Sequence, residues 1–372
     1  MKKFLAFVMA ASMALSLAAC GGSSASTATS TTTEATSEAA ASTSGSKTDV
    51  AFVTDVGNID DQSFNQYTWQ GVQDFCSANS LNANYYRPTE DSDAARLEQM
   101  DNAVNDGAKS IVVAGYLFGN AIAEAQEKYP DVQFLALDVS ASDLGDKAPT
   151  ANTALITYKE EQAGYAAVYD GYKELGFLGG MAVPAVIRYG YGFVQGADAA
   201  AKEIGATDVN IKYWYSGGFA ATDEVKNKMD GWYSEGTEVV FACGGPVCQS
   251  CDAAAQANGG KMIGVDVDQS GQFDTVVTSA MKGLAESVNE ALTDALNNGW
   301  KFSETYSGKE TKLGAAENCV GLPMSTSKFT KFTQEQYDSM YASIVDGTLA
   351  IDDSYDADVK PAVTTITVDY QS

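Results

Sequence analysis

Short apolar runs alternate with helical patterns along the chain from residue 50 onward. A run such as Val50–Val53 is too short for a helix and is rich in valine and phenylalanine, which indicates a buried strand. The stretch that follows, 63–78, has apolar residues at helical spacing. Repeated alternation of this kind predicts parallel sheets covered by helices, which is an α/β fold.

The alternation extends through most of the chain. We expect strands at 50–53, 84–86, 110–114, 133–137, 152–157, 177–179, 210–215, 238–242, 262–265 and 275–279. We expect helices at 63–78, 92–106, 121–128, 160–175, 186–204, 223–234, 251–258 and 283–298. In both halves of the chain, apolar strands end in Asp or Gly and a helix follows. This shared pattern predicts two lobes facing each other across a cleft.

The loop 54–66 places several polar side chains at the carboxyl end of the first strand, where open α/β sheets bind ligands. It offers the carboxylates of Asp55 and Asp61, the amide of Asn65 and the ring of Phe64. Acidic groups repel phosphate and suit a neutral ligand with hydroxyl or amine donors. The alternative interpretation is an ordinary helix start, with Asp60 or Asp61 as the cap and Phe64 in the core.

Other expected strand ends and turns carry comparable residues. Phe219 follows two glycines, and Lys282 stands beside an expected strand end. The alternatives are a core position for Phe219 and a solvated helix start for Lys282. The further candidates at strand ends are Gly115, Tyr116, Asp138, Gly245 and Asp266.

The first 47 residues predict export and anchoring. Lys2 and Lys3 precede the apolar stretch 4–17, typical of a signal peptide that spans 1–19. Small residues before Cys20 resemble the lipobox of bacterial lipoproteins, which implies lipidation of Cys20; a plain secretory signal is the alternative. Residues 20–47 then form a Ser/Thr/Ala tether, which spans roughly 30 Å as a random coil.

Composition narrows the function classes. The chain has 23 Lys and Arg against 49 Asp and Glu, so no basic face for a nucleic acid is expected. It has no His, which excludes Ser-His-Asp and Cys-His catalysis and removes the commonest metal ligand. We therefore expect no cofactor, no metal and no enzymatic activity, although carboxylate-only chemistry stays open.

Five cysteines follow Cys20, and the set 243–251 includes a Cys-x-x-Cys pair. A zinc site would need a fourth ligand, for which Cys319 is the obvious thiol. We favour an ordinary strand–loop–helix with small thiol side chains, and a Cys248–Cys251 disulfide is an open alternative outside the cytosol.

The chain resembles the basic membrane protein family, the purine-nucleoside-binding lipoproteins of ABC importers. The resemblance covers nearly all of 48–372. It is carried by segments at 54–57, 61–66, 179–184, 215–219, 242–245, 264–269 and 278–282, which read TDVG, DQSFNQ, GGMAVP, YSGGF, ACGG, GVDVDQ and TSAMK. The segment 217–223 and the cysteines behind Gly245 depart from the family pattern.

The resemblance implies a type I periplasmic-binding fold of two Rossmann-like lobes with parallel sheets, joined by three crossovers near 155, 281 and 322. The implied lobes are 48–155 plus 282–322 and 156–281 plus 323–372. Phe64 and Phe219 would stack on a base, while Asp266 and Lys282 would hold ribose hydroxyls. Asp138 and Asn65 would serve the base edge or the sugar.

The implied function is that of a monomeric, lipid-anchored binding protein on the extracytoplasmic face of the membrane. It would deliver a purine nucleoside to an ABC permease. A binder of a sugar or another small polar ligand on the same fold, a ligand sensor, and a secreted carboxylate enzyme are the alternatives.

Overall fold

The structure, a computed structural model, describes residues 47–55 and 57–372. The predictions for the signal peptide, Cys20 and the tether lie outside the described residues. The described residues belong to one compact unit. None of its helices combines the length and the apolar character that crossing a bilayer requires.

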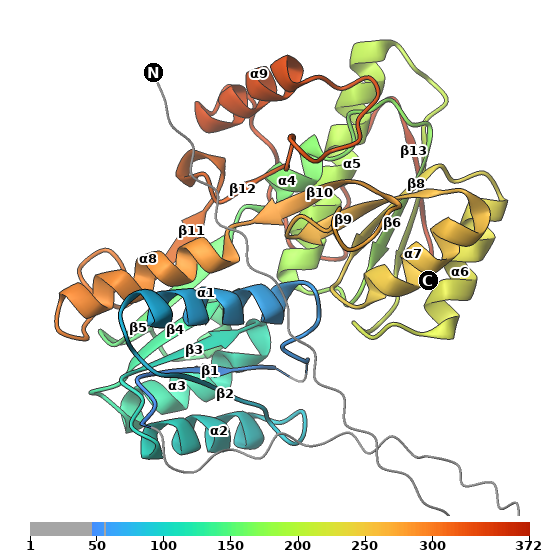
Figure 1. Cartoon of the computed structure of the whole chain (residues 1–372). Coiled ribbons are helices and arrows are strands. Elements are labelled where there is room, and N and C mark those ends of the chain that lie inside the picture. Colours follow the sequence, from blue (N-terminus) through green and yellow to red (C-terminus); the bar gives the residue numbers. More distant parts are fainter. Residues whose placement is uncertain (1–46, 56) are drawn as a thin grey trace, which may run out of the picture. The chain divides into compact units, whose positions relative to one another are not determined.

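Six parallel strands form the first sheet, in the order β11-β5-β4-β3-β1-β2 (Figure 1). Alternate residues of β1 join different apolar clusters: Val50 and Phe52 face α1 and α8, and Ala51 and Val53 face α2 and α3. Both faces are therefore covered, as parallel sheets require. The elements are β1 (Val50–Val53), β2 (Ala83–Tyr86), β3 (Ser110–Ala114), β4 (Gln133–Leu137), β5 (Thr153–Tyr158), β11 (Lys309–Leu313), α1 (Phe64–Ala78), α2 (Asp93–Asn105), α3 (Gly119–Lys128) and α8 (Leu284–Asn297).

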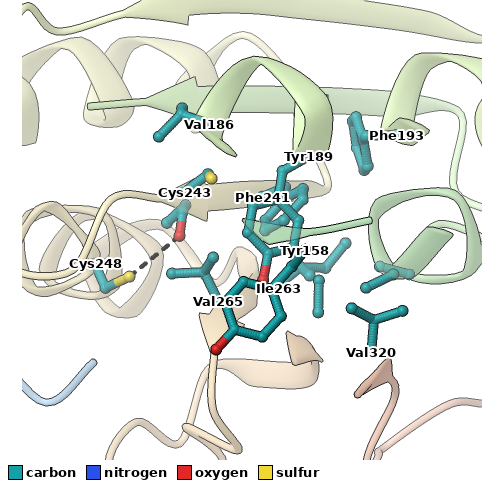
Figure 2. Packing of buried hydrophobic residues seen from close by; sticks show 14 of the residues in the cluster. Tyr158, Val186, Tyr189, Phe193, Phe241, Cys243, Cys248, Ile263, Val265 and Val320 are labelled. Atoms are coloured by element: carbon teal, nitrogen blue, oxygen red, sulfur yellow. Dashed lines mark hydrogen bonds between the residues drawn. The ribbon is translucent and has the colours of Figure 1, made fainter. Parts of the chain in front are cut away.

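Seven strands form the second sheet, in the order β12-β10-β9-β8-β6-β7-β13, and only the short β12 runs antiparallel to its neighbour. Successive residues of β6 face opposite sides: Gly176 lies against Trp232 of α6, and Phe177 packs on Phe193 of α5. Figure 2 shows the face of this sheet that α5 covers, where the ring of Phe241 contacts those of Tyr189 and Phe193. The elements are β6 (Glu174–Gly179), β7 (Asn210–Tyr215), β8 (Val239–Cys243), β9 (Lys261–Asp266), β10 (Val276–Lys282), β12 (Val320–Gly321), β13 (Thr367–Tyr370), α4 (Glu160–Ala166), α5 (Pro184–Ile204), α6 (Asp223–Ser234), α7 (Val247–Asn258) and α9 (Gln334–Val345).

The chain passes between the two sheets three times: between β5 and β6, between β10 and β11, and between β11 and β12. Two mainly parallel sheets with three connections are the architecture that the sequence predicts, so the fold class is confirmed. Apart from the short β12, the strands of each sheet run in one direction. The carboxyl ends of β1, β3 and β4 therefore share one edge of the first sheet, and those of β6, β8 and β9 share one edge of the second.

The predicted helix at 160–175 is wrong in its length. Helix α4 ends at Ala166, and β6 already begins at Glu174. Between them Asp170 accepts the backbone N–H groups of three successive residues, 330–332, and Gly171 adopts a φ of 78°. The chain thus turns early because Asp170 binds a distant loop. The strands β11, β12 and β13 and helix α9 were not predicted; they are short or strongly polar.

Helices α4 and α5 touch through their backbones. Gly192 and Gly196 lie one turn apart on α5, and a Cβ on either would overlap the carbonyl of Glu161 or Tyr165 of α4. Glycine spacing of this kind lets two helices approach more closely than side chains allow. This contact fixes the start of α4, and with it Glu160, relative to α5.

We expect Gly192→Ala to destabilise the protein by about 1–3 kcal/mol, because the added methyl group overpacks the contact between α4 and α5. Gly231→Ala in α6 is the matched control, since a Cβ there meets open space. It should leave stability unchanged or raise it by up to about 1 kcal/mol. Chemical denaturation of both variants measures the difference, and equal stabilities would show that the close approach is not required.

Candidate functional site

Asp61 lies under the start of α1 and acts as its cap. Its carboxylate accepts the backbone N–H groups of Ser63, Asn65 and Gln66 at 2.9–3.0 Å, and the Asn65 amide at 3.1 Å. Burial raises the pKa of Asp61, and these hydrogen bonds oppose that shift. The structure therefore gives Asp61 the capping role that the sequence left as the alternative.

Asp55 and Asn65 lie together behind this loop. Asp55 Oδ1 accepts the backbone N–H of Gly57 at 2.6 Å and the amide of Asn65 at 3.2 Å. Burial raises the pKa of Asp55. Asn65 Oδ1 is a buried acceptor that has no partner within the described residues. A buried acceptor left without a donor costs free energy, so it indicates a place where a ligand could donate.

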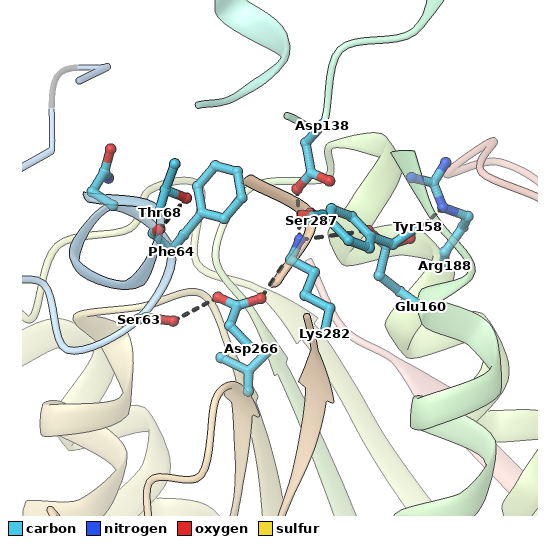
Figure 3. Close-up of polar contacts among 12 residues, drawn as sticks. Ser63, Phe64, Thr68, Asp138, Tyr158, Glu160, Arg188, Asp266, Lys282 and Ser287 are labelled. Carbon is cyan, nitrogen blue, oxygen red and sulfur yellow. Dashed lines mark hydrogen bonds and ion pairs between the residues drawn. The ribbon is translucent and has the colours of Figure 1, made fainter. Parts of the chain in front are cut away.

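Lys282, the last residue of β10, is the centre of a charged cluster (Figure 3). Its Nζ lies 2.6 Å from Asp138, 3.5 Å from Glu160 and 3.6 Å from Asp266, and the side chain is 2% exposed. Burial lowers the pKa of Lys282, but the three carboxylates outweigh burial and raise it well above its ordinary value. The lysine therefore carries a charge, and it joins the carboxyl ends of β4 and β9.

Aromatic rings surround the same ammonium group. The ring centroids of Phe64, Tyr158 and Tyr189 lie 4.7, 5.2 and 5.8 Å from Lys282 Nζ. The Phe64 ring also lies near Gly115, where φ is 110° and a Cβ would stand 3.9 Å from the ring. Phe64 is thus only partly buried and borders the polar cluster, although it also packs on the core.

Asp138 and Asp266 occupy a strained position at the ends of their strands. Their φ angles are 53° and 66°, in the left-handed region that residues other than glycine rarely adopt. Strain of this kind collects at functional sites. Burial raises the pKa of Asp138 to about 6 although Lys282 opposes the shift, and its Oδ1 has no partner within the described residues.

Glu160 and Arg188 extend the cluster, and the sequence did not predict their roles. Glu160 is fully buried, and its Oε2 accepts from Arg188 Nε at 2.6 Å. Burial lowers the pKa of Arg188, but Glu160 more than compensates and raises it. A single arginine inside the apolar stretch 186–194 was the available signal for this buried ion pair.

The remaining candidates lie nearby but outside the network around Lys282. Phe219 packs over the backbone of Gly180 and Gly244. Gly245 faces the loop before α1, because a Cβ on it would lie 3.7 Å from Ser63 Cβ. Tyr116 is half-buried on the turn Tyr116–Phe118 that follows β3. In the part of the chain that the structure describes, no ring contact joins Phe219 to Phe64.

The five cysteines of the described residues are all free and buried, so the Cys248–Cys251 disulfide is not formed. No group of three or more cysteine and acidic side chains within this part is arranged to hold a metal ion. Cys248 donates to the carbonyl of Ala242 at 3.2 Å. The arrangement is that of a strand–loop–helix with packed thiols.

Two sheets whose strand ends share one buried polar cluster define a two-lobed solute-binding fold. A solved structure of an ABC transporter solute-binding protein from Aeropyrum pernix superimposes with a TM-score of 0.69. The match covers 84% of this chain and 95% of that one at 19% identity, which shows the shared fold. The sequence family Bmp, described as "ABC transporter substrate-binding protein PnrA-like", matches residues 48–354. The chain belongs to this family of ABC transporter substrate-binding proteins, which are binders and not enzymes.

Two relatives show how far the similarity extends. A CD4+ T-cell-stimulating antigen of Listeria monocytogenes is 26% identical over 329 residues, covering 81% of this chain and 87% of the relative. An ABC transporter nucleoside-binding protein of Lactococcus lactis is 28% identical over 247 residues, covering 61% and 67%.

Glu161 gives the fold a pH dependence. Burial raises its pKa to about 8, Glu160 adds to the shift, and Lys312 and Arg188 oppose it. Because this pKa is raised above that of the unfolded chain, the folded protein holds a proton that the unfolded chain releases. The free energy of unfolding should therefore fall as pH rises from 4.5 to about 8.

We expect Glu161→Gln to flatten the fall in melting temperature between pH 5 and pH 8, about the window that the raised pKa defines. Glu203→Gln, which changes an exposed carboxylate of α5, is the control. Scanning calorimetry at both pH values measures the effect. A fall in Glu161→Gln as steep as that of the unchanged protein would contradict the assignment.

Proposed function

We propose that this protein binds a purine nucleoside between its two lobes and delivers it to an ABC permease. The proposed lobes are 48–155 plus 282–322 and 156–281 plus 323–372. The sheets depart from these bounds at their ends, since β5 of the first sheet continues to Tyr158, and Lys282 and β12 belong to the second sheet.

The observation that carries the proposal is that a partly buried ring, Phe64, and the unpartnered Oδ1 of Asp138 both lie beside the buried ammonium of Lys282. A second unpartnered oxygen, Asn65 Oδ1, lies next to Phe64 at the start of α1.

Charge supports a neutral ligand with donor groups. Asp138, Asp266 and Glu160 surround Lys282, and Arg188 is paired with Glu160, so carboxylates outnumber cations. A phosphate would add negative charge beside these carboxylates, whereas the hydroxyl groups of ribose would donate to them. We therefore assign Asp266 and Lys282 to the sugar.

The aromatic rings and one relative favour a base over a free sugar. Phe64 and Phe219 are proposed to stack on the base, a contact worth about 1–3 kcal/mol per ring. The relative from Lactococcus lactis is named as nucleoside-binding. Asp138 and Asn65 would contact the base edge or the sugar, and Gly115 and Gly245 would let the backbone approach. Asp55 and Tyr116 would line the same space.

Titration calorimetry with guanosine, inosine and adenosine tests the proposal, with free ribose as the competing ligand class. We expect a purine nucleoside to bind at micromolar concentration or tighter and ribose not to bind. Mass spectrometry of small molecules released from the denatured protein identifies any ligand that is retained. Failure of all three nucleosides to bind would reject the proposal, and binding of ribose would favour the sugar alternative.

Phe64→Ala and Asp266→Ala should each weaken nucleoside binding by about tenfold to hundredfold, because the first removes a stacked ring and the second an acceptor for ribose. Tyr355→Ala, which removes a ring that is 57% exposed, is the control. Calorimetric dissociation constants for the three variants measure the effect. Unchanged affinity in both site variants would refute this placement of the ligand.

We also propose that Cys20 carries a lipid that holds the protein, as a monomer, on the outer face of the membrane. Cys20→Ser should release the protein from the membrane fraction and abolish incorporation of labelled palmitate. Cys76→Ser, which changes a buried thiol of α1, is the matched control. Retention of the label in Cys20→Ser would exclude this anchor.

A further inference from the structure

Two hydrogen bonds connect the loop before α1 directly with the loop after β9. Ser63 Oγ donates to Asp266 Oδ2 at 2.5 Å, as Figure 3 shows. Gln269 Nε2 donates to the backbone carbonyl of Gln62 at 3.2 Å. Gln62 and Ser63 follow β1 of the first sheet, whereas Asp266 ends β9 of the second sheet and Gln269 follows it. These bonds therefore span the two lobes.

Ser63 is free to make its bond because it does not cap its own helix. It occupies the N-cap position of α1 with a φ of −153°, yet its side chain accepts no bond from the helix. Asp61 caps the helix instead. A serine at this position ordinarily uses its hydroxyl as the cap. Here the hydroxyl is fully buried and points across to Asp266.

Gln269 is held in one orientation by its own lobe. Its Oε1 accepts the backbone N–H of Val265 at 3.0 Å and the thiol of Cys248 at 3.5 Å. Its backbone N–H donates to Ser279 Oγ at 3.1 Å. Because Oε1 is occupied by donors, the amide nitrogen must face the other lobe, where it reaches Gln62. The backbone N–H of Val265 is the donor that fixes this orientation, because the single thiol proton of Cys248 has the carbonyl of Ala242 as its nearer acceptor.

The backbone on both sides of the contact is strained. Gln62 has a φ of 58° and Asp266 a φ of 66°, and neither is glycine. Such conformations are unfavourable for residues other than glycine and persist where surrounding contacts enforce them. The strained residues Gln62 and Asp266 are themselves partners in the two hydrogen bonds that join the lobes. The contact therefore belongs to the arrangement of the lobes in which these two loops touch.

We propose that Ser63 and Gln269 form a latch between the lobes that sets the lifetime of the closed, ligand-holding state. Ser63 acts by positioning Asp266, and Gln269 acts by holding the loop before α1, so neither has to touch the ligand. The proposal rests on the proposed binding of a nucleoside between the lobes. A latch that forms after the ligand has entered slows release and leaves association nearly unchanged.

The test compares Ser63→Ala, Gln269→Glu and the control Ser77→Ala, which changes an exposed serine of the same helix α1. Gln269→Glu keeps an acceptor for Val265 and Cys248 but sets a second acceptor against the Gln62 carbonyl. Stopped-flow mixing with guanosine gives both rates. We expect each latch variant to raise the dissociation rate by about threefold to tenfold and to leave the association rate unchanged within about twofold.

Pulsed dipolar spectroscopy supplies a readout that does not depend on ligand identity. Spin labels at Glu98→Cys of α2 and Asn227→Cys of α6, both exposed, report the distance between the lobes of the nucleoside-depleted protein. Both latch variants should shift the distribution toward longer distances, and Ser77→Ala should not. Unchanged distances and unchanged dissociation rates in both variants would overturn the latch. If guanosine, inosine and adenosine all fail to bind the unchanged protein, the nucleoside proposal fails, and the distances alone decide the latch.

Discussion

The buried ammonium group of Lys282 is the charge around which the two sheets meet. It ends a strand of the second sheet, but its shortest ion pair is with Asp138, which follows a strand of the first. Leaving either charge buried and unpaired would cost several kcal/mol. The ion pair therefore favours those arrangements in which the carboxyl ends of both sets of strands lie together, and this is the condition for any site between them.

The position of Glu160 shows how packing supports this electrostatic centre. Glu160 is fully buried and accepts from both Lys282 and Arg188, so it must be placed accurately relative to β10 and α5. The glycines of α5 allow the backbone of α4 to lie directly on the backbone of α5. A methyl group at this contact would shift the start of α4 and lengthen both ion pairs. The small residues of α5 thus have an electrostatic consequence at the site.

Local pattern was enough to predict the fold class, because each strand of Val, Phe and Ala is buried on both faces and is bounded by loops. It was not enough for α4, whose end depends on Asp170 binding a loop about 160 residues further along the chain. The same limit applies to the site. Asp138, Asp266 and Lys282 stand at strand ends and Phe64 at a helix start, so each could be selected from its own segment. Their contacts with Glu160 and Arg188 join segments far apart in the sequence, and no local pattern encodes such pairs.

The charge balance of the cluster also constrains what the proposed site selects. Arg188 is paired with Glu160, so Lys282 alone faces Asp138 and Asp266, and a net negative charge remains. Burial raises the pKa of Asp138, the charge of Glu160 adds to the shift, and Lys282 opposes it. A ligand that donates hydroxyl groups stabilises these carboxylates without adding charge, whereas a phosphorylated ligand would increase the excess. On the proposed function, the cluster would therefore suit a nucleoside better than the corresponding nucleotide, and the unpartnered Oδ1 of Asp138 would be the acceptor that favours a donor group over a phosphate.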